Sequence, residues 1–144
     1  MELSDVMHWI RTAKQERNER NKANYLAFLL SEVAECLECL DDQDLQVLAI
    51  QIQDVSLDMR NKQYDALISS ANQAKLMDAA FDSAWCALGF MNMLGHAPHA
   101  WAEGASSNYS KFNHDGTASL TPDGKVIKGP NFREPDFTKC VDSQ

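Results

Sequence analysis

The sequence is poor in basic residues. It has 13 lysines and arginines against 21 aspartates and glutamates, a formal net charge of −8 at pH 7. Proteins that bind nucleic acid need a basic patch or stripe for the phosphate backbone, so we expect no nucleic-acid partner. A small anionic ligand remains compatible with an acidic chain if metal ions neutralise the binding site locally.

Long apolar runs are also absent. No segment reaches the roughly 18 uncharged apolar residues of a membrane-spanning helix. The first residues, Met-Glu-Leu-Ser-Asp, lack the basic and then apolar segments of a secretory signal. We therefore expect a cytoplasmic protein without a membrane partner, whose four cysteines are reduced thiols. Cys36 and Cys39 form a single Cys-x-x-Cys pair, which predicts buried thiols rather than a zinc site because no second pair accompanies it.

Strand-like alternation is missing before residue 115, whereas helical spacing of apolar residues recurs. Five helices are predicted, over residues 4–20, 21–40, 45–59, 73–94 and 98–111. Gly95 is expected to end the fourth helix, and Pro98 to begin the fifth at its first turn. The prediction is an all-α helical bundle that occupies residues 1–114.

The tail from residue 115 differs in composition. It contains three of the four prolines and three of the six glycines. Residues 121–124, Thr-Pro-Asp-Gly, indicate a turn between two short segments, which predicts a small β-hairpin over residues 118–127. We expect residues 115–144 to form a non-helical arm that packs on the helical domain.

Acidic residues have a defined place on the second predicted helix. Its apolar stripe comprises Leu26, Leu29, Leu30, Val33, Leu37 and Leu40. Glu35 lies opposite this stripe, with Glu32 and Glu38 on either side of it. Phe28 and Cys39 share the acidic face, which predicts a helix buried on both sides with its glutamates toward the interior. A solvated acidic face is the alternative.

The fourth predicted helix carries a second acidic pair. Between Leu76 and Gly95 the only charged residues are Asp78 and Asp82, one helical turn apart. Two such carboxylates repel each other, so we expect a cation nearby, either a metal ion or the neighbouring Lys75. Two acidic pairs on two helices can form an all-oxygen site, which suits Mg²⁺ or Mn²⁺ rather than zinc.

These segments resemble a known family. Residues 31–35, Ser-Glu-Val-Ala-Glu, resemble the Glu-x-x-Glu motif of MazG-like all-α nucleoside triphosphate pyrophosphohydrolases. Residues 77–82, Met-Asp-Ala-Ala-Phe-Asp, resemble its second motif, usually Glu-x-x-Asp. Here Ala79 stands at the glutamate position and Asp78 precedes it, a departure from the motif. Residues 107–112 and 123–130 resemble the ending of phage and bacterial members.

The resemblance implies metal-dependent hydrolysis of a nucleoside or deoxynucleoside triphosphate. Water attacks the α-phosphorus, and a monophosphate and pyrophosphate leave. The metal ligands implied are Glu32, Glu35, Asp78 and Asp82, for Mg²⁺ with Mn²⁺ as a substitute. Glu32, Glu35 and Asp82 are also the implied catalytic residues, together with Glu38, which binds a second ion or orients the attacking water.

The resemblance also implies substrate contacts and self-association. Lys111 is expected to contact phosphate with Asn108 beside it, and Lys125, Lys128 and Arg133 of the arm to close over the phosphates. Asn24, in the segment before the first motif, completes the expected substrate contacts. A homodimer or homotetramer in a bacterium or phage-infected host is expected, while base and sugar preference stay open.

Three other functions are alternatives. A phosphoribosyl-ATP pyrophosphohydrolase would share the fold and the leaving group. A non-catalytic helical interaction protein would show no metal dependence. A di-iron carboxylate bundle would need Glu-x-x-His pairs on its helices, and the sequence contains none.

Overall fold

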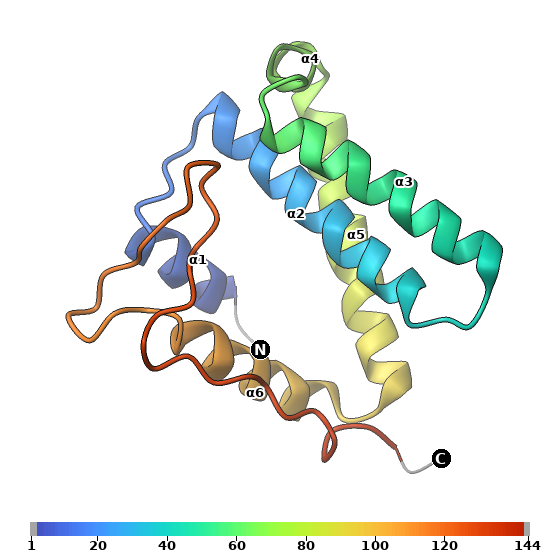
Figure 1. Ribbon diagram of the computed structural model, residues 1–144, viewed down its shortest axis with the longest axis vertical. Helices are drawn as coiled ribbons and strands as arrows, with labels where there is room; N and C mark the ends of the chain where they lie inside the picture. The colour runs from blue at the N-terminus through green and yellow to red at the C-terminus, as the bar shows by residue number, and fades with distance from the viewer. Residues whose placement is uncertain (1–2, 143–144) are drawn as a thin grey trace. The chain divides into compact units, whose positions relative to one another are not determined.

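The computed structural model describes residues 3–142, and this part of the chain forms six helices and no strand (Figure 1). They are α1 (Leu3–Thr12), α2 (Glu19–Glu38), α3 (Gln43–Arg60), α4 (Asp65–Ser70), α5 (Gln73–Leu94) and α6 (Ala97–Tyr109). The predicted all-α fold is confirmed. None of these helices combines the length and hydropathy that a membrane crossing requires.

Contacts divide the chain into two compact units. One unit comprises Glu16–Ala71 and contains α2, α3 and α4. The other contains α1 together with everything from Asn72 onward, namely α5, α6 and the arm that follows α6.

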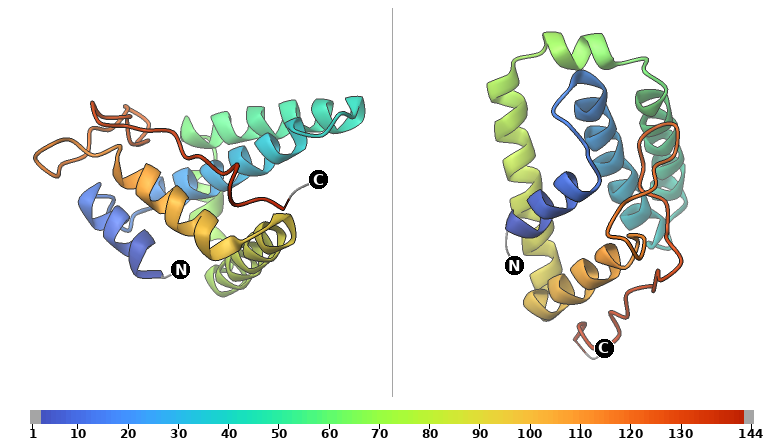
Figure 2. Two further views of the ribbon diagram at one scale, coloured as in Figure 1. Left: turned by 90° about the horizontal axis from the view of Figure 1, so that it is seen from below. Right: turned by 90° about the vertical axis from the view of Figure 1, so that its left-hand side faces the viewer.

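In the first unit, α2 and α3 pack side by side as an antiparallel pair (Figures 1 and 2). Their contact uses small side chains: Ala27 and Ala34 of α2 and Ala49 and Ser56 of α3 are fully buried. The Ser56 hydroxyl donates a hydrogen bond of 2.7 Å to the Ala27 carbonyl oxygen. Because these side chains are small, the two backbones approach closely.

The predicted leucine stripe of α2 is therefore not its principal packing face. Leu29, Val33 and Leu40 are 37%, 44% and 49% exposed. On a helix with about 100° per residue, the buried alanines lie roughly a quarter turn from the centre of this stripe. Apolar spacing identified the helix correctly, but the small residues beside the stripe determine which face meets α3.

Helix α4 was not predicted. It spans only six residues, Asp65–Ser70, too few to show helical periodicity in the sequence. Tertiary contacts hold it, because Ile68 is buried and Asp65 Oδ1 lies 2.9 Å from Arg20 Nη1 at the start of α2. Arg20 also donates to the carbonyl oxygen of Met59, at the end of α3.

Helix α1 is shorter than predicted. It ends at Thr12 rather than continuing to residue 20, and Lys14 adopts a left-handed backbone conformation with φ of 53°. The buried Gln15 donates a 3.0 Å hydrogen bond from Nε2 to the carbonyl oxygen of Gly124 in the arm. This long-range contact requires the chain to leave the helix, and local sequence does not reveal it.

In the second unit, the arm returns to the corner between α5 and α6. Gly95 forms an antiparallel bridge with Val141, and the His96 N–H donates to the Cys140 carbonyl oxygen at 2.8 Å. A Cβ atom at position 95 would lie 2.1 Å from that same oxygen. Glycine is thus required here by the close approach of two backbones, in addition to ending α5 as predicted.

The predicted hairpin forms its turn and a single antiparallel bridge, but no strand within residues 3–142. Gly124 has φ of 90°, and its N–H donates to the Thr121 carbonyl oxygen at 2.9 Å. Leu120 and Val126 form a single antiparallel bridge, and no strand extends from it within residues 3–142.

Candidate functional site

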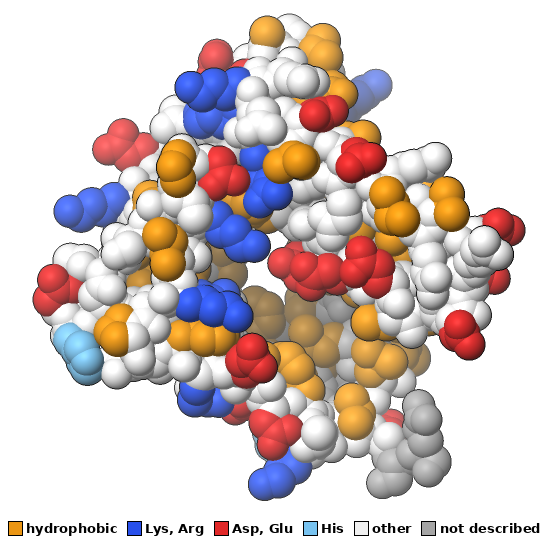
Figure 3. Space-filling view, viewed as in Figure 1, with side chains coloured by type: hydrophobic (Ala, Val, Ile, Leu, Met, Phe, Trp, Pro, Cys, Tyr) orange, Lys and Arg blue, Asp and Glu red, His pale blue; other side chains and the backbone are white. Residues whose placement is uncertain are grey.

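The three predicted glutamates of α2 are exposed. Glu32, Glu35 and Glu38 all lie on the solvent-accessible part of the helix, and acidic side chains gather over its C-terminal half in Figure 3. The expectation that they face the interior is wrong. The reason is the alanine contact with α3, which leaves the acidic face of α2 open to solvent.

The two aspartates of α5 are exposed as well. Asp78 and Asp82 lie one turn apart on a helix in which no residue is buried. No ion pair found among residues 3–142 involves either of them. Lys75, the alternative to a metal ion as their compensating cation, therefore forms no ion pair with them. Their repulsion is left for solvent or a bound cation to screen.

The acidic pairs belong to different units. The glutamates are in the unit of α2 to α4, and the aspartates are in the unit of α1, α5 and α6. Within residues 3–142, no cluster of three or more His, Cys, Asp or Glu side chains is arranged to hold a metal ion. The donors themselves fit Mg²⁺ or Mn²⁺, because every side chain in question offers carboxylate oxygens.

Three of the predicted substrate residues do come together. Lys111 Nζ donates a 2.8 Å hydrogen bond to Asn108 Oδ1 at the end of α6. The ammonium groups of Lys111 and Lys128 lie 5.9 Å and 4.3 Å from the centre of the same ring, Phe132. A hollow of about 500 Å³ is lined by all four residues and by Glu134, whose Oε1 lies 3.8 Å from Lys128 Nζ. Lysine and arginine side chains are visible over the arm in Figure 3.

The backbone of the arm explains why Lys128 reaches this hollow. The Gly129 N–H donates a 2.9 Å hydrogen bond to the Lys111 carbonyl oxygen. A Cβ atom at position 129 would lie 2.5 Å from that oxygen, so only glycine permits the contact. Gly129 therefore fixes the arm against the end of α6 and holds the neighbouring Lys128 beside Lys111.

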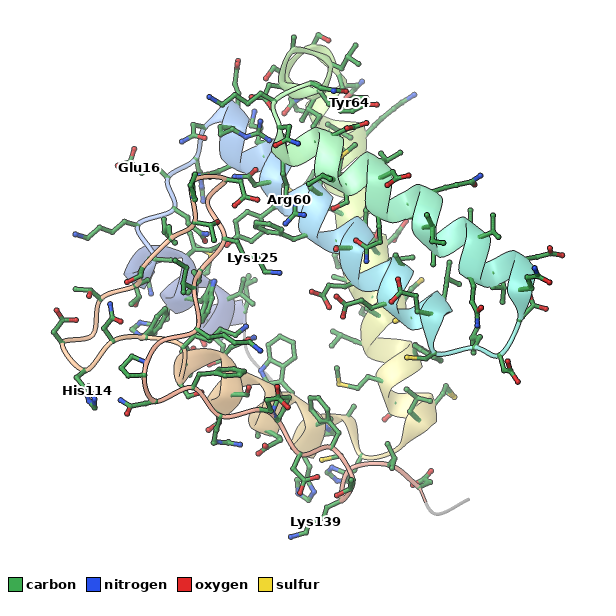
Figure 4. All side chains as sticks on the ribbon, in the orientation of Figure 1. Glu16, Arg60, Tyr64, His114, Lys125 and Lys139 are labelled. Atoms are coloured by element: carbon green, nitrogen blue, oxygen red, sulfur yellow. The ribbon has the colours of Figure 1, made fainter. Side chains whose placement is uncertain are left out.

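The remaining predicted contacts have other environments. Lys125 projects from the loop of the arm and does not line the hollow (Figure 4). Asn24 is only 2% exposed, within the other unit. Arg133, also basic and in the arm, forms an ion pair with Glu103 of α6, with Nη1 and Oε1 2.6 Å apart. Its hydrogen bonds hold the pKa of Glu103 below the ordinary glutamate value, and Glu103 raises the pKa of Arg133.

An aromatic pocket beside the hollow was missed. It has a volume of about 320 Å³, and its walls include Trp9, Trp101, Tyr109 and Phe137. Asp5 holds two of these rings: Trp101 Nε1–H donates to its Oδ2 at 2.8 Å, and the Tyr109 hydroxyl donates to its carbonyl oxygen at 3.0 Å. Burial, with the charge of Asp5 second, raises the pKa of Tyr109, so the phenol stays protonated as a donor.

Sequence spacing could not reveal this pocket, because α1 and α6 are about a hundred residues apart. The one available signal was the tryptophan content of the two helices. No family model, curated protein or solved structure matches this chain.

Proposed function

We propose that the chain is a metal-dependent nucleoside triphosphate pyrophosphohydrolase, which releases a monophosphate and pyrophosphate. The observation that carries the proposal is the pair Asp78 and Asp82. These carboxylates lie one turn apart and exposed in the segment of α5 from Leu76 to Leu94, which has no other charged residue, and no ion pair found in the described part of the chain involves them. Such a pair is suited to bind a cation from solvent.

The metal ligands in this proposal are Glu32, Glu35, Asp78 and Asp82, and the ion is Mg²⁺ or Mn²⁺. The bound ion would supply Lewis-acid polarisation of the phosphoryl oxygens and a water of lowered pKa. Glu38, one turn beyond Glu35 on the same helix, would bind a second ion or orient the attacking water. This division of roles follows the resemblance to the MazG-like enzymes.

The hollow that contains Lys111 and Lys128 supports the proposal on the substrate side. A triphosphate needs positive charge beyond the metal, and Lys111 and Lys128 supply two ammonium groups over one ring. Asn108, bonded to Lys111, keeps that ammonium at the end of α6. Both lysines come from a chain whose overall charge is strongly negative, which makes their pairing in one hollow informative.

The experiment is pyrophosphate release from each ribo- and deoxynucleoside triphosphate, with Mg²⁺ and with a chelator. Glu35→Gln and Asp82→Asn should abolish release while the helical circular dichroism signal stays unchanged. Asp54→Asn, which removes an exposed aspartate of α3, is the matched control and should keep full activity.

Each other outcome has a clear meaning. Strong release by both Glu35→Gln and Asp82→Asn would overturn the metal-ligand assignment. Hydrolysis of phosphoribosyl-ATP alone would redirect the proposal to that related activity. An absence of metal-dependent hydrolysis across the panel would leave the helical interaction protein as the function.

A further inference from the structure

We infer that the aromatic pocket between α1 and α6 receives the base of a nucleotide that carries an exocyclic amino group. The inference rests on the proposed function in one respect: that function identifies the anionic group attached to the base as phosphate. The pocket and the hollow beside it belong to one unit, so the argument uses only contacts within that unit.

The size and walls of the pocket suit a flat aromatic ring. Its volume of about 320 Å³ is at the small end of the range for ligand pockets, enough for a base but not for a whole nucleoside triphosphate. Indole rings of Trp9 and Trp101 provide faces on which a base can stack, and stacking of this kind contributes about 1–3 kcal/mol per base. The other walls are mainly apolar, with Met91 and Phe137 among them.

The aromatic walls are fixed in place before any ligand arrives. The Trp101 ring is held by its bond to Asp5, and Trp9 stacks on Phe112 with ring centres 4.8 Å apart and planes 27° apart. Because these rings are already ordered, a ligand that stacks on them loses little binding energy to side-chain ordering.

The pocket opens beside positive charge. Gly104, Asn108 and Phe137 line both the pocket and the hollow that contains Lys111 and Lys128. Lys111 itself joins the two, because its Nζ lies 5.6 Å from the centre of the Trp9 ring in the pocket wall. A ligand that fits both the pocket and the hollow has an aromatic ring with an anionic group attached close to it. A nucleotide has this form.

The polar edge of the pocket selects among bases. Asp5 contributes a carboxylate, which accepts hydrogen bonds and donates none. A base with an exocyclic amino group, such as guanine, adenine or cytosine, can donate to it. Uracil and thymine present carbonyl oxygens on both sides of their single ring N–H, and these oxygens are repelled by a carboxylate. Discrimination against those two bases is therefore expected.

Tryptophan fluorescence tests the inference without any catalytic step. Trp85 is 70% exposed on α5 and does not line the pocket, so a Trp85→Phe background leaves Trp9 and Trp101 as the reporters. Monophosphates of guanosine, adenosine, cytidine and uridine are titrated with no Mg²⁺ present, and inorganic phosphate serves as the control. The three amino-bearing nucleotides should quench saturably, whereas uridine monophosphate should bind at least about tenfold more weakly and phosphate should not quench.

Variants then locate the binding site. Phe137→Ala, at an exposed residue of the arm, should weaken binding without affecting the helices. Trp101→Leu should weaken it roughly five- to 150-fold, the equivalent of the stacking energy, whereas Trp101→Phe should retain most of it. Circular dichroism checks that each variant is folded. If the tryptophan variants do not fold, the Phe137→Ala result decides whether the nucleotide binds in the pocket.

The outcomes separate this inference from the proposed function. Saturable quenching together with no hydrolysis of any triphosphate would uphold the pocket and overturn the enzyme. Metal-dependent hydrolysis with no quenching by any monophosphate, or with unchanged binding by Phe137→Ala and Trp101→Leu, would overturn the pocket alone. Equal binding of uridine monophosphate would overturn the role of Asp5.

Discussion

Lys111 is the residue at which the two candidate parts of the substrate site meet. Its ammonium group bonds to Asn108, lies near the Trp9 ring in the pocket and lies over Phe132 in the hollow. We predict that Lys111→Gln raises the KM for the triphosphate at least about tenfold, because a charge-assisted hydrogen bond to phosphate contributes about 1.5–3 kcal/mol. Steady-state pyrophosphate release measures the change.

The control for this prediction is Lys139→Gln, which removes an exposed lysine elsewhere in the arm (Figure 4). It alters the net charge equally, so a purely global electrostatic effect would appear in both variants. An unchanged KM for Lys111→Gln, or an equal rise for Lys139→Gln, would contradict a phosphate contact at Lys111.

At the residue scale, the sequence predicted partners that are close along the chain or share a motif. Asn108 and Lys111 are three residues apart on one helix, and the structure brings them together with Lys128. Asp5 and Trp101 are 96 residues apart, and no spacing rule links them. The burial of the α2 glutamates was predicted wrongly, because exposure depends on which face of the helix the neighbouring helix covers.

The element scale shows the same limit. Helices α2, α3, α5 and α6 follow their apolar periodicity to within a few residues. The end of α1 and the whole of α4 depend on tertiary contacts, Gln15 with Gly124 and Arg20 with Asp65. Such contacts join segments that are distant along the chain, and the sequence of neither segment predicts the contact.

The small-residue contact between α2 and α3 makes a prediction about stability. Ala27 is fully buried where the Ser56 hydroxyl meets its carbonyl oxygen, so no space exists for a larger side chain. Ala27→Leu should lower the free energy of unfolding by about 1–3 kcal/mol through overpacking. Ala66→Leu, at an exposed position of α4, should change it by less than about 0.5 kcal/mol. Urea denaturation measures both, and a similar effect of the two substitutions would contradict close packing.

The attachment of the arm to α6 is expected to depend on pH. Glu103 Oε1 accepts hydrogen bonds from Arg133 Nη1 at 2.6 Å and from the Asp136 N–H at 2.9 Å. The Arg133 hydrogen bond is the main cause of the lowered pKa of Glu103. A carboxyl group with a lowered pKa stabilises the folded form above its unfolded pKa, about 4.3, and the stabilisation disappears as the pH falls through the folded value.

Hydrogen exchange at the Asp136 amide measures this effect. Its protection factor should be constant near neutral pH and should fall as the pH drops below about 4.3. The pKa of Asp136 itself is lowered by its hydrogen bonds with Thr138, so protonation of its carboxyl group at acidic pH is a second source of pH dependence. The Glu103→Gln variant separates the effect of Glu103 from that of Asp136. Its protection factor should be lower than that of the native chain at neutral pH, and should fall less at acidic pH. An identical pH profile in the variant would assign the effect to Asp136.

At the scale of the whole molecule, the chain exposes more surface than its size requires. Two separate compact bodies with the lengths of its two units would expose roughly 8,900 Å². The chain exposes 10211 Å². Much of this surface is apolar, and α5 alone exposes Met77, Phe81, Trp85, Phe90 and Met93 by more than half. Large exposed apolar surfaces mark sites of association.

We propose a second copy of the chain as the partner, and predict a homodimer or homotetramer whose interface includes α5. Analytical ultracentrifugation over a range of concentrations should give a mass of two or four chains. Met93→Glu, which adds a charge to a side chain that is 77% exposed on α5, should raise the dissociation constant at least about tenfold because a buried charge without a partner is costly. Leu67→Glu, at a 64% exposed leucine of α4, is the matched control and should leave association unchanged. A monomer at every concentration would contradict self-association, and a loss of association in Leu67→Glu alone would move the interface from α5 to α4.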